Sequence, residues 1–156
     1  MRLLASLLVV SALAFAGCAS SAPAEPHTPS SLGAFSISLA VKDLAASRAF
    51  YEKLGFTQTG GDAAQKWLVL RNGDAVVGLF EGMLPKNTLT FNPGWNQQAQ
   101  PVARFEDVRS IQARFEQAGL VPEPKADPAS TGPGYLMLID PDGNPVLIDQ
   151  HVGKPQ

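Results

Sequence analysis

Residues 35–41, FSISLAV, alternate apolar and small polar side chains, which is the period-2 pattern of a β-strand with one apolar face. From Asp43 onward the spacing changes, and over residues 47–54 one aromatic and apolar face recurs at i, i+3, i+4 and i+7. This spacing predicts an amphipathic helix that Asp43 caps and Gly55 ends. We expect the aromatic stripe of this helix, which includes Phe50, to pack on the sheet.

Three more strands are predicted in the first half of the chain. Residues 56–59 can form a short strand, and residues 66–71 (KWLVLR) and 75–81 (AVVGLFE) form two more. The last two strands are joined through Asn72-Gly73, a pair that tolerates the positive φ angles of a tight hairpin. The first half is therefore predicted as a strand, a helix and three strands.

The second half repeats this order at matched spacing. A helix is expected from Asp107 to Gly119, and both helical segments measure 12 residues from the capping aspartate to the glycine, since 119 − 107 equals 55 − 43. Residues 135–139 and 145–150 read as strands that flank the turn at 140–144, DPDGN. Such self-similarity indicates a duplicated supersecondary unit.

The opening strand of the repeat has two candidates. Residues 89–92 have a better strand composition than residues 102–105, so we favour the former. Residues 122–133 contain four prolines and are expected to form an edge segment followed by a loop beside the opening of the domain. We predict an α+β fold of two βαβββ modules, at about 34–83 and 87–151.

The first 17 residues form a separate segment. Arg2 precedes an uncharged apolar run that is short for a membrane span, and small residues lead to Cys18, the only cysteine of the chain. The segment resembles a bacterial lipoprotein signal, which implies cleavage before Cys18, a lipid on that residue, and a bacterial cell-envelope protein anchored to a membrane and facing the periplasm or the exterior. An ordinary secretory signal is the alternative. Residues 18–31, rich in Pro, Ser and Ala, are expected to form a tether and residues 32–156 the folded domain.

Length and charge restrict the function. From residue 32 about 125 residues remain, enough for one compact domain but not for two of ordinary size. The formal net charge is −2, and it becomes −3 when a signal with one arginine and no acid is removed. Because the chain has no cluster of Lys and Arg, its composition gives no support to nucleic-acid binding.

Two motifs carry a resemblance to a known family. Residues 41–44 (VKDL) with residues 50–56 (FYEKLGF), and the turn at 140–144 (DPDGN) before the last strand, resemble the vicinal oxygen chelate superfamily. That superfamily includes glyoxalase I, extradiol dioxygenases and bleomycin resistance proteins. The resemblance spans nearly all of residues 35–151 and implies paired βαβββ modules whose curled sheets enclose one cleft.

The resemblance also implies where a metal would bind. Metal-dependent members hold a divalent cation with His, Gln or Glu side chains on cleft-facing strand positions. Three of these positions fall on Ser36, Val77 and Leu147, and the fourth falls either on Gln100 or on a residue among Thr88, Thr90 and Asn92. Since Val and Leu cannot coordinate a metal, we expect no cofactor at the usual centre.

A displaced divalent-metal centre is the alternative. Asp149 and His151 lie two residues apart on one strand face, and Glu81 would share their cleft if it lies on the same side as Val77. Asp149 could also orient His151 for proton transfer, and these two residues are the only catalytic candidates we can name.

Strand alternation predicts most of the lining of the cleft, and Trp95 is added because it follows a Pro-Gly turn beside a polar loop at 96–100. We expect the cleft to bind a small organic ligand through six residues, namely Ser36, Ser38, Asn92, Trp95, Asp149 and His151. Trp67, which shares strand parity with Arg71, is either a further lining residue or part of the core. The alternatives are a metal-dependent lyase or dioxygenase and a structural or interaction module of the envelope. The sequence also leaves open whether the modules pair within one chain or by exchange in a homodimer.

Overall fold

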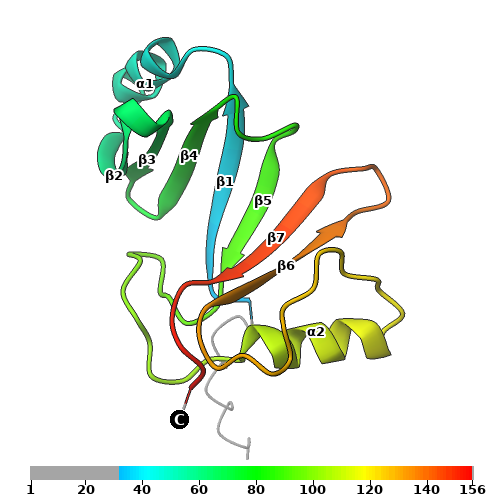
Figure 1. The fold of residues 1–156 in the computed structure, drawn as a ribbon. Coiled ribbons are helices and arrows are strands. Elements are labelled where there is room, and N and C mark those ends of the chain that lie inside the picture. Colours follow the sequence, from blue (N-terminus) through cyan, green and yellow to red (C-terminus); the bar gives the residue numbers. More distant parts are fainter. Residues whose placement is uncertain (1–31, 156) are drawn as a thin grey trace, which may run out of the picture.

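The computed structural model describes residues 32–155 (Figure 1). The predicted signal, the lipidation site at Cys18 and the tether lie outside the described residues. The elements in chain order are β1 (Ala34–Val41), α1 (Leu44–Lys53), β2 (Thr57–Asp62), the 3-10 turn η1 (Ala63–Gln65), β3 (Trp67–Asn72), β4 (Ala75–Glu81), β5 (Thr88–Asn92), α2 (Val108–Gln117), β6 (Gly134–Ile139) and β7 (Pro145–Gln150). The fold is α+β, as predicted. No helix within residues 32–155 is long and apolar enough to cross a membrane.

The strands form one seven-stranded mixed sheet in the order β2-β3-β4-β1-β5-β7-β6. The two opening strands, β1 and β5, pair antiparallel at its centre, and each pairs in parallel with the closing strand of its own repeat, β4 or β7. This arrangement joins the two modules within one chain. The preferred opening strand of the second module is confirmed, since β5 covers Thr88–Asn92.

The second module contains the predicted edge segment. It has three strands, and its fourth is reduced to a short edge segment in which Glu123 N donates to Met137 O (2.8 Å) and Met137 N donates to Pro124 O (3.1 Å). Because Pro122 and Pro124 have no N–H group, this segment cannot extend the hydrogen-bond ladder. The edge segment predicted within residues 122–133 is therefore confirmed, and it stands where the βαβββ order of the second module has its remaining strand.

Both helices are capped by the predicted aspartates. Asp43 Oδ1 accepts from Ala46 N (2.9 Å), and Asp107 Oδ1 accepts from Arg109 N (3.0 Å). After each helix a glycine adopts a left-handed φ, +88° at Gly55 and +83° at Gly119. Figure 1 shows the two helices at opposite ends of the curled sheet.

Each helix packs on its own hydrophobic cluster on the outer face of the sheet. Leu44 and Tyr51 of α1 meet Leu70 and Leu79 in the first cluster, while α2 contributes Ile111 to the second. Because side chains alternate along a strand, the opposite face is left free to line a cleft.

Phe50 does not belong to the core, which corrects the expectation for its helix. Its side chain is 58% exposed and meets Tyr51 edge-on, with ring centroids 5.3 Å apart. Tyr51 contacts the core cluster, whereas the preceding residue Phe50 is on a part of the helix that the sheet does not cover.

A buried ion pair organises the start of α2. Arg109 Nη1 lies 3.2 Å from Asp107 Oδ2, and both side chains are less than one-tenth exposed. Gln150, fully buried on β7, donates to Asp107 Oδ2 (3.0 Å) and accepts from Val108 N (2.8 Å). Burial alone would raise the pKa of Asp107, but the hydrogen bonds from Gln150 and Arg109 together hold that pKa below its usual value.

Candidate ligand-binding cleft

The inner face of the sheet forms one cleft of about 770 Å³. It is lined from all seven strands and from the segments at 83–84 and 95–99. All six residues predicted for a cleft lie in this lining: Ser36, Ser38, Asn92, Trp95, Asp149 and His151. Their place in the lining is as expected, and their binding of a ligand stays a prediction.

Hydroxyl groups cover the middle of the cleft floor. Ser36 pairs with Thr90 across β1 and β5, and Thr90 pairs with Leu147 across β5 and β7. The Ser38 and Thr90 hydroxyl oxygens are 3.0 Å apart, and both side chains are buried. Ser36, Thr90 and Leu147 thus form one row across three strands, and this row offers hydroxyl groups but no imidazole and no carboxylate.

This row decides where the metal positions implied by the resemblance lie. Thr90, which sits between Ser36 and Leu147 in the sheet, occupies the fourth position, whereas Gln100 lies outside the cleft lining. Val77 was misplaced, because it belongs to the outer core and its neighbour Val76 faces the cleft.

The donor set does not fit a divalent ion. Two of the four positions are aliphatic and the other two are neutral hydroxyls, whereas a usable site needs three or four imidazole, thiolate or carboxylate ligands. Within residues 32–155 no group of three or more His, Cys, Asp and Glu side chains could hold a metal ion.

The displaced metal centre proposed from sequence is wrong about Glu81. Its Oε2 accepts from Leu44 N (3.0 Å) and its Oε1 lies 3.2 Å from Lys66 Nζ. The Leu44 N–H and then the Lys66 ammonium lower the pKa of Glu81. Glu81 therefore caps and braces α1 and is absent from the cleft lining.

Sheet register gives the separation between Glu81 and the other two residues. Val41 at the end of β1 pairs with Glu81, whereas Ala34 at its start pairs with Asn92, which donates to Asp149 O (2.9 Å). Seven residues of strand separate the two ends of β1, which is roughly 23 Å at about 3.3 Å per residue. Glu81 and Asp149 therefore lie at opposite ends of the sheet's central strands.

Asp149, His151 and Trp95 form one group at the end of the cleft. His151 Nε2 lies 3.3 Å from Asp149 Oδ2, and the imidazole stacks on Trp95 with ring centroids 4.4 Å apart and an interplanar angle of 15°. Burial raises the pKa of Asp149, and the charge of His151 partly opposes that shift. The group can exchange hydrogen bonds or a proton with a bound molecule.

Arg71 is a lining residue that the sequence prediction left out. Its Nη1 donates to Gln97 O, and the Gln97 side chain in turn accepts from Phe35 N (3.0 Å) and donates to Asp74 O (2.7 Å). Gln97 thus ties the segment at 93–101 to β1 and to the β3–β4 turn. The only signal in the sequence was the parity that Arg71 shares with Trp67.

The other end of the cleft is apolar. Trp67 and Phe80 lie parallel, with ring centroids 6.3 Å apart and an interplanar angle of 6°. Met83, another lining residue, is 55% exposed. Gly78 lies between Val76 and Phe80 on the floor, and a Cβ atom there would fall 2.6 Å from Phe80 Cε2. The glycine therefore lets the Phe80 ring fold down over the strand.

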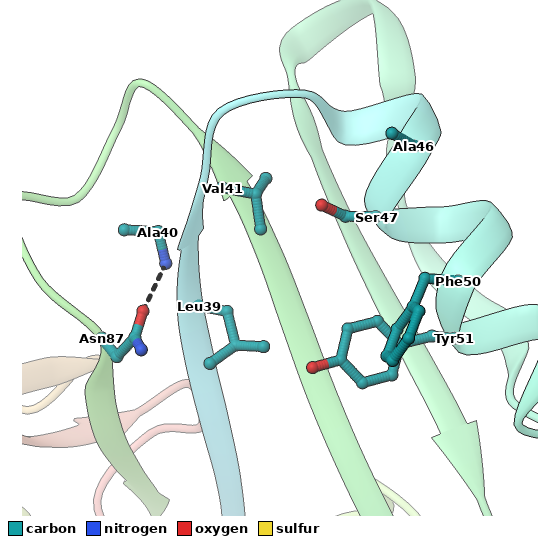
Figure 2. Close-up of a pocket in the computed structure, with 8 residues that line it drawn as sticks. All are labelled: Leu39, Ala40, Val41, Ala46, Ser47, Phe50, Tyr51 and Asn87. Atoms are coloured by element: carbon teal, nitrogen blue, oxygen red, sulfur yellow. Dashed lines mark hydrogen bonds between the residues drawn. The ribbon is translucent and has the colours of Figure 1, made fainter.

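A smaller hollow of about 430 Å³ lies between α1 and β1 (Figure 2). Figure 2 shows Leu39 and Val41 of β1 on one side and Phe50 and Tyr51 of α1 on the other. Asn87 Oδ1, at its edge, accepts from Ala40 N (3.1 Å). The hollow has no acidic or basic side chain in its lining, so we assign no chemistry to it.

The fold and the cleft define a protein of the two-module type with a concave inner face. Residues 33–148 match the sequence profile of the Glyoxalase/Bleomycin resistance protein/Dioxygenase superfamily. This match covers well over half of the chain, and the protein belongs to that superfamily. Comparison with curated protein sequences gives no match.

Solved structures share the fold at low sequence identity. One is described as an NAD-dependent benzaldehyde dehydrogenase from Legionella pneumophila, with 18% identity, a TM-score of 0.55, and coverage of 75% of this chain and 98% of that one. A superfamily member from Vibrio splendidus 12B01 has 15% identity, a TM-score of 0.52, and coverage of 74% and 97%.

A third similar structure is larger than this protein. It is an extradiol ring-cleaving dioxygenase from B. fuscum, with 23% identity, a TM-score of 0.52, and coverage of 80% of this chain but 34% of the dioxygenase. At these identities the likeness concerns the fold alone.

Proposed function

We propose that this protein binds a small organic molecule in the cleft between its two modules without the help of a metal ion. The observation that carries the proposal is the lining of the 770 Å³ cleft, which combines aromatic rings with a few polar groups. Both tryptophans of the chain, Trp67 and Trp95, are in that lining. Ligand sites are typically concave, of this size, and mostly apolar with a few placed polar groups.

The proposal is tested with a thermal-shift screen of the full-length protein against organic acids, bases and neutral aromatic compounds. A ligand at about a hundred times its dissociation constant should stabilise the fold by roughly 2.7 kcal/mol. If no compound in a broad screen raises the melting temperature, the cleft does not bind ligands and a structural role is favoured.

A cleft-filling variant shows whether a stabilising compound uses this site. Gly60 lines the cleft, and a Cβ atom there would lie 3.6 Å from Val69 Cβ, an ordinary contact. Gly60→Leu should therefore fold and weaken binding. Gly132→Leu is the matched control, because a Cβ atom at Gly132, outside the cleft lining, meets no atom closer than 4.0 Å. Equal binding by both variants would place the ligand elsewhere.

We also propose that Cys18 is lipid-modified and anchors the protein to a membrane of the bacterial cell envelope. The support is the resemblance of the first 17 residues to a lipoprotein signal and the position of the chain's single cysteine. Mass spectrometry of the protein from membranes should show a chain that begins with an acylated Cys18. An unmodified cysteine at or within the mature terminus would contradict this proposal.

A further inference from the structure

The cleft has two chemically different ends along one strand. Trp67, Val69 and Arg71 all line it from β3, at positions i, i+2 and i+4. Four residues of strand span about 13 Å at roughly 3.3 Å per residue. A ligand lying along β3 would therefore meet an aromatic ring, an aliphatic side chain and a guanidinium in that order.

The guanidinium of Arg71 has no anionic partner within residues 32–155. The ion pairs of this part of the chain involve other cations, and the one hydrogen bond that Arg71 donates goes to the backbone carbonyl of Gln97. The nearby carboxylate of Asp74 is used instead by Gln98 Nε2, at 2.9 Å. A partly buried guanidinium with unused N–H groups favours a carboxylate or another planar anion, to which it can donate two parallel bonds.

The Gln97 contact also fixes Arg71 in place. Gln97 holds both backbone groups of Phe35, accepting from N at 3.0 Å and donating to O at 2.6 Å. The carbonyl that receives Arg71 is therefore anchored to β1, so little side-chain entropy remains to be lost when an anion binds.

The aromatic end of the cleft suits a planar apolar group. The parallel rings of Trp67 and Phe80 and the exposed thioether of Met83 present large polarisable surfaces with no charged group among them. The charged groups of the opposite wall, Asp149 and His151, are paired with each other. Asp149 lies on β7, four strands away from β3 in the sheet order, and His151 follows the end of that strand.

We propose that the ligand is an amphipathic organic anion whose carboxylate or sulfonate binds Arg71 and whose aromatic body lies against Trp67 and Phe80. This inference rests on the ligand-binding function proposed above and specifies its chemical class. It adds to that function a head-group site and an orientation along β3.

The test uses two probes of nearly equal shape, 4-(2-naphthyl)butyrate and its neutral amide, titrated calorimetrically into the full-length protein. The anion should bind about 10- to 100-fold more tightly than the amide, as expected for a charge-assisted hydrogen bond. Arg71→Met should reduce that ratio to near one, and Arg71→Lys should keep part of it. Lys53→Met, which removes an exposed cation from the end of α1, is the matched charge control and should keep the full ratio.

A second variant separates the body of the ligand from its head group. Trp67→Leu should weaken the anion and the amide by the same factor, because it removes the stacking surface and leaves Arg71 in place. A general loosening of the loop at 93–101 in Arg71→Met would also weaken both probes equally, so only the ratio reports on the head-group site.

The outcomes separate this inference from the proposed function. If both probes bind equally to the wild-type protein, or the ratio survives Arg71→Met, the anion site is refuted while ligand binding stands. If neither probe binds but other compounds stabilise the wild type and not Gly60→Leu, the chemical class is refuted alone. If no compound binds, the anion site and the proposed ligand-binding function are both refuted.

Discussion

Gly78→Ala is the perturbation that tests the packing of the apolar end most sharply. The φ angle of Gly78 is not positive, so alanine can adopt the backbone conformation without strain. The added Cβ would lie 2.6 Å from Phe80 Cε2, whereas ordinary contacts begin at 3.4 Å. The Phe80 ring must therefore move by 0.8 Å or more, the difference of these distances, and leave its parallel position on Trp67.

Two opposing effects decide the stability of this variant. Alanine in a strand interior is favoured over glycine by about 0.5–1 kcal/mol. Loss of an aromatic pair removes about 0.5–1.5 kcal/mol. The two nearly cancel, so the net change lies within about 1 kcal/mol and the melting temperature shifts by no more than a few degrees. The variant stays folded while the surface offered to a ligand changes.

The assay is the ¹H–¹⁵N resonance of the Trp67 indole, assigned with Trp67→Phe, together with urea denaturation. Gly78→Ala should shift this resonance and leave that of the Trp95 indole unchanged. In a Phe80→Leu background the added methyl no longer meets a ring, so the two substitutions should be non-additive. Strict additivity, or an unmoved Trp67 resonance, would refute the packing described for Gly78 and Phe80.

Three further predictions concern charge and metal. Asp107→Asn keeps a helix cap but breaks the buried pair with Arg109, so it should destabilise the fold by about 3 kcal/mol at neutral pH. Since the pKa of Asp107 is lowered, its contribution is fully present above the usual aspartate pKa, and the loss measured by urea denaturation should shrink only as the pH falls below that value toward the lowered pKa. Asp149→Asn should behave oppositely. Burial raises the pKa of Asp149, so its contribution to stability is present in acid and lost as the pH rises through that pKa. The variant should therefore be at least as stable as the wild type at pH 7, and the difference in stability should close in acid. Addition of Zn²⁺, Mn²⁺ or Fe²⁺ should leave the melting temperature unchanged, and a stoichiometric metal ion that is lost in His151→Ala would contradict the metal-free cleft.

Side-chain periodicity was enough to predict most of the fold and one wall of the cleft. Alternation placed Ile37 and Leu39 in the core and Ser36 and Ser38 in the cleft, because burial of one face fixes strand parity. The same reasoning placed Asp149 in the cleft.

The error at Val77 has a geometric cause. Val77 and Leu147 each lie four residues after the glycine of their turn, Gly73 and Gly143, and this spacing makes them counterparts in the sequence. The turns differ in length, however, since Asn72 pairs with Ala75 in the first hairpin and Ile139 pairs with Pro145 in the second. A mismatch of one residue reverses the face that every side chain in a strand points to. For the same reason Glu81 was predicted on the cleft face and lies on the outer face.

Arg71 and Gln97 could not have been assigned from local patterns. Their contact links β3 to a segment 26 residues away, and the position of Gln97 depends on hydrogen bonds to Phe35 at a separation of 62 residues. No periodicity reports on such long-range loop contacts. Phe50 shows a related limit, because helical spacing identifies an apolar stripe but not how much of it the sheet covers.

The most direct test of a ligand-binding cleft is chemical-shift mapping of the full-length protein with a compound that raises its melting temperature. If the compound binds in the cleft, saturable shifts should appear at one or both indole N–H resonances, from Trp67 and Trp95, and at the neighbouring amides of β1 and β5. Shifts confined to the hollow beside Phe50 and Asn87, with both indole resonances unmoved, would contradict ligand binding in the cleft.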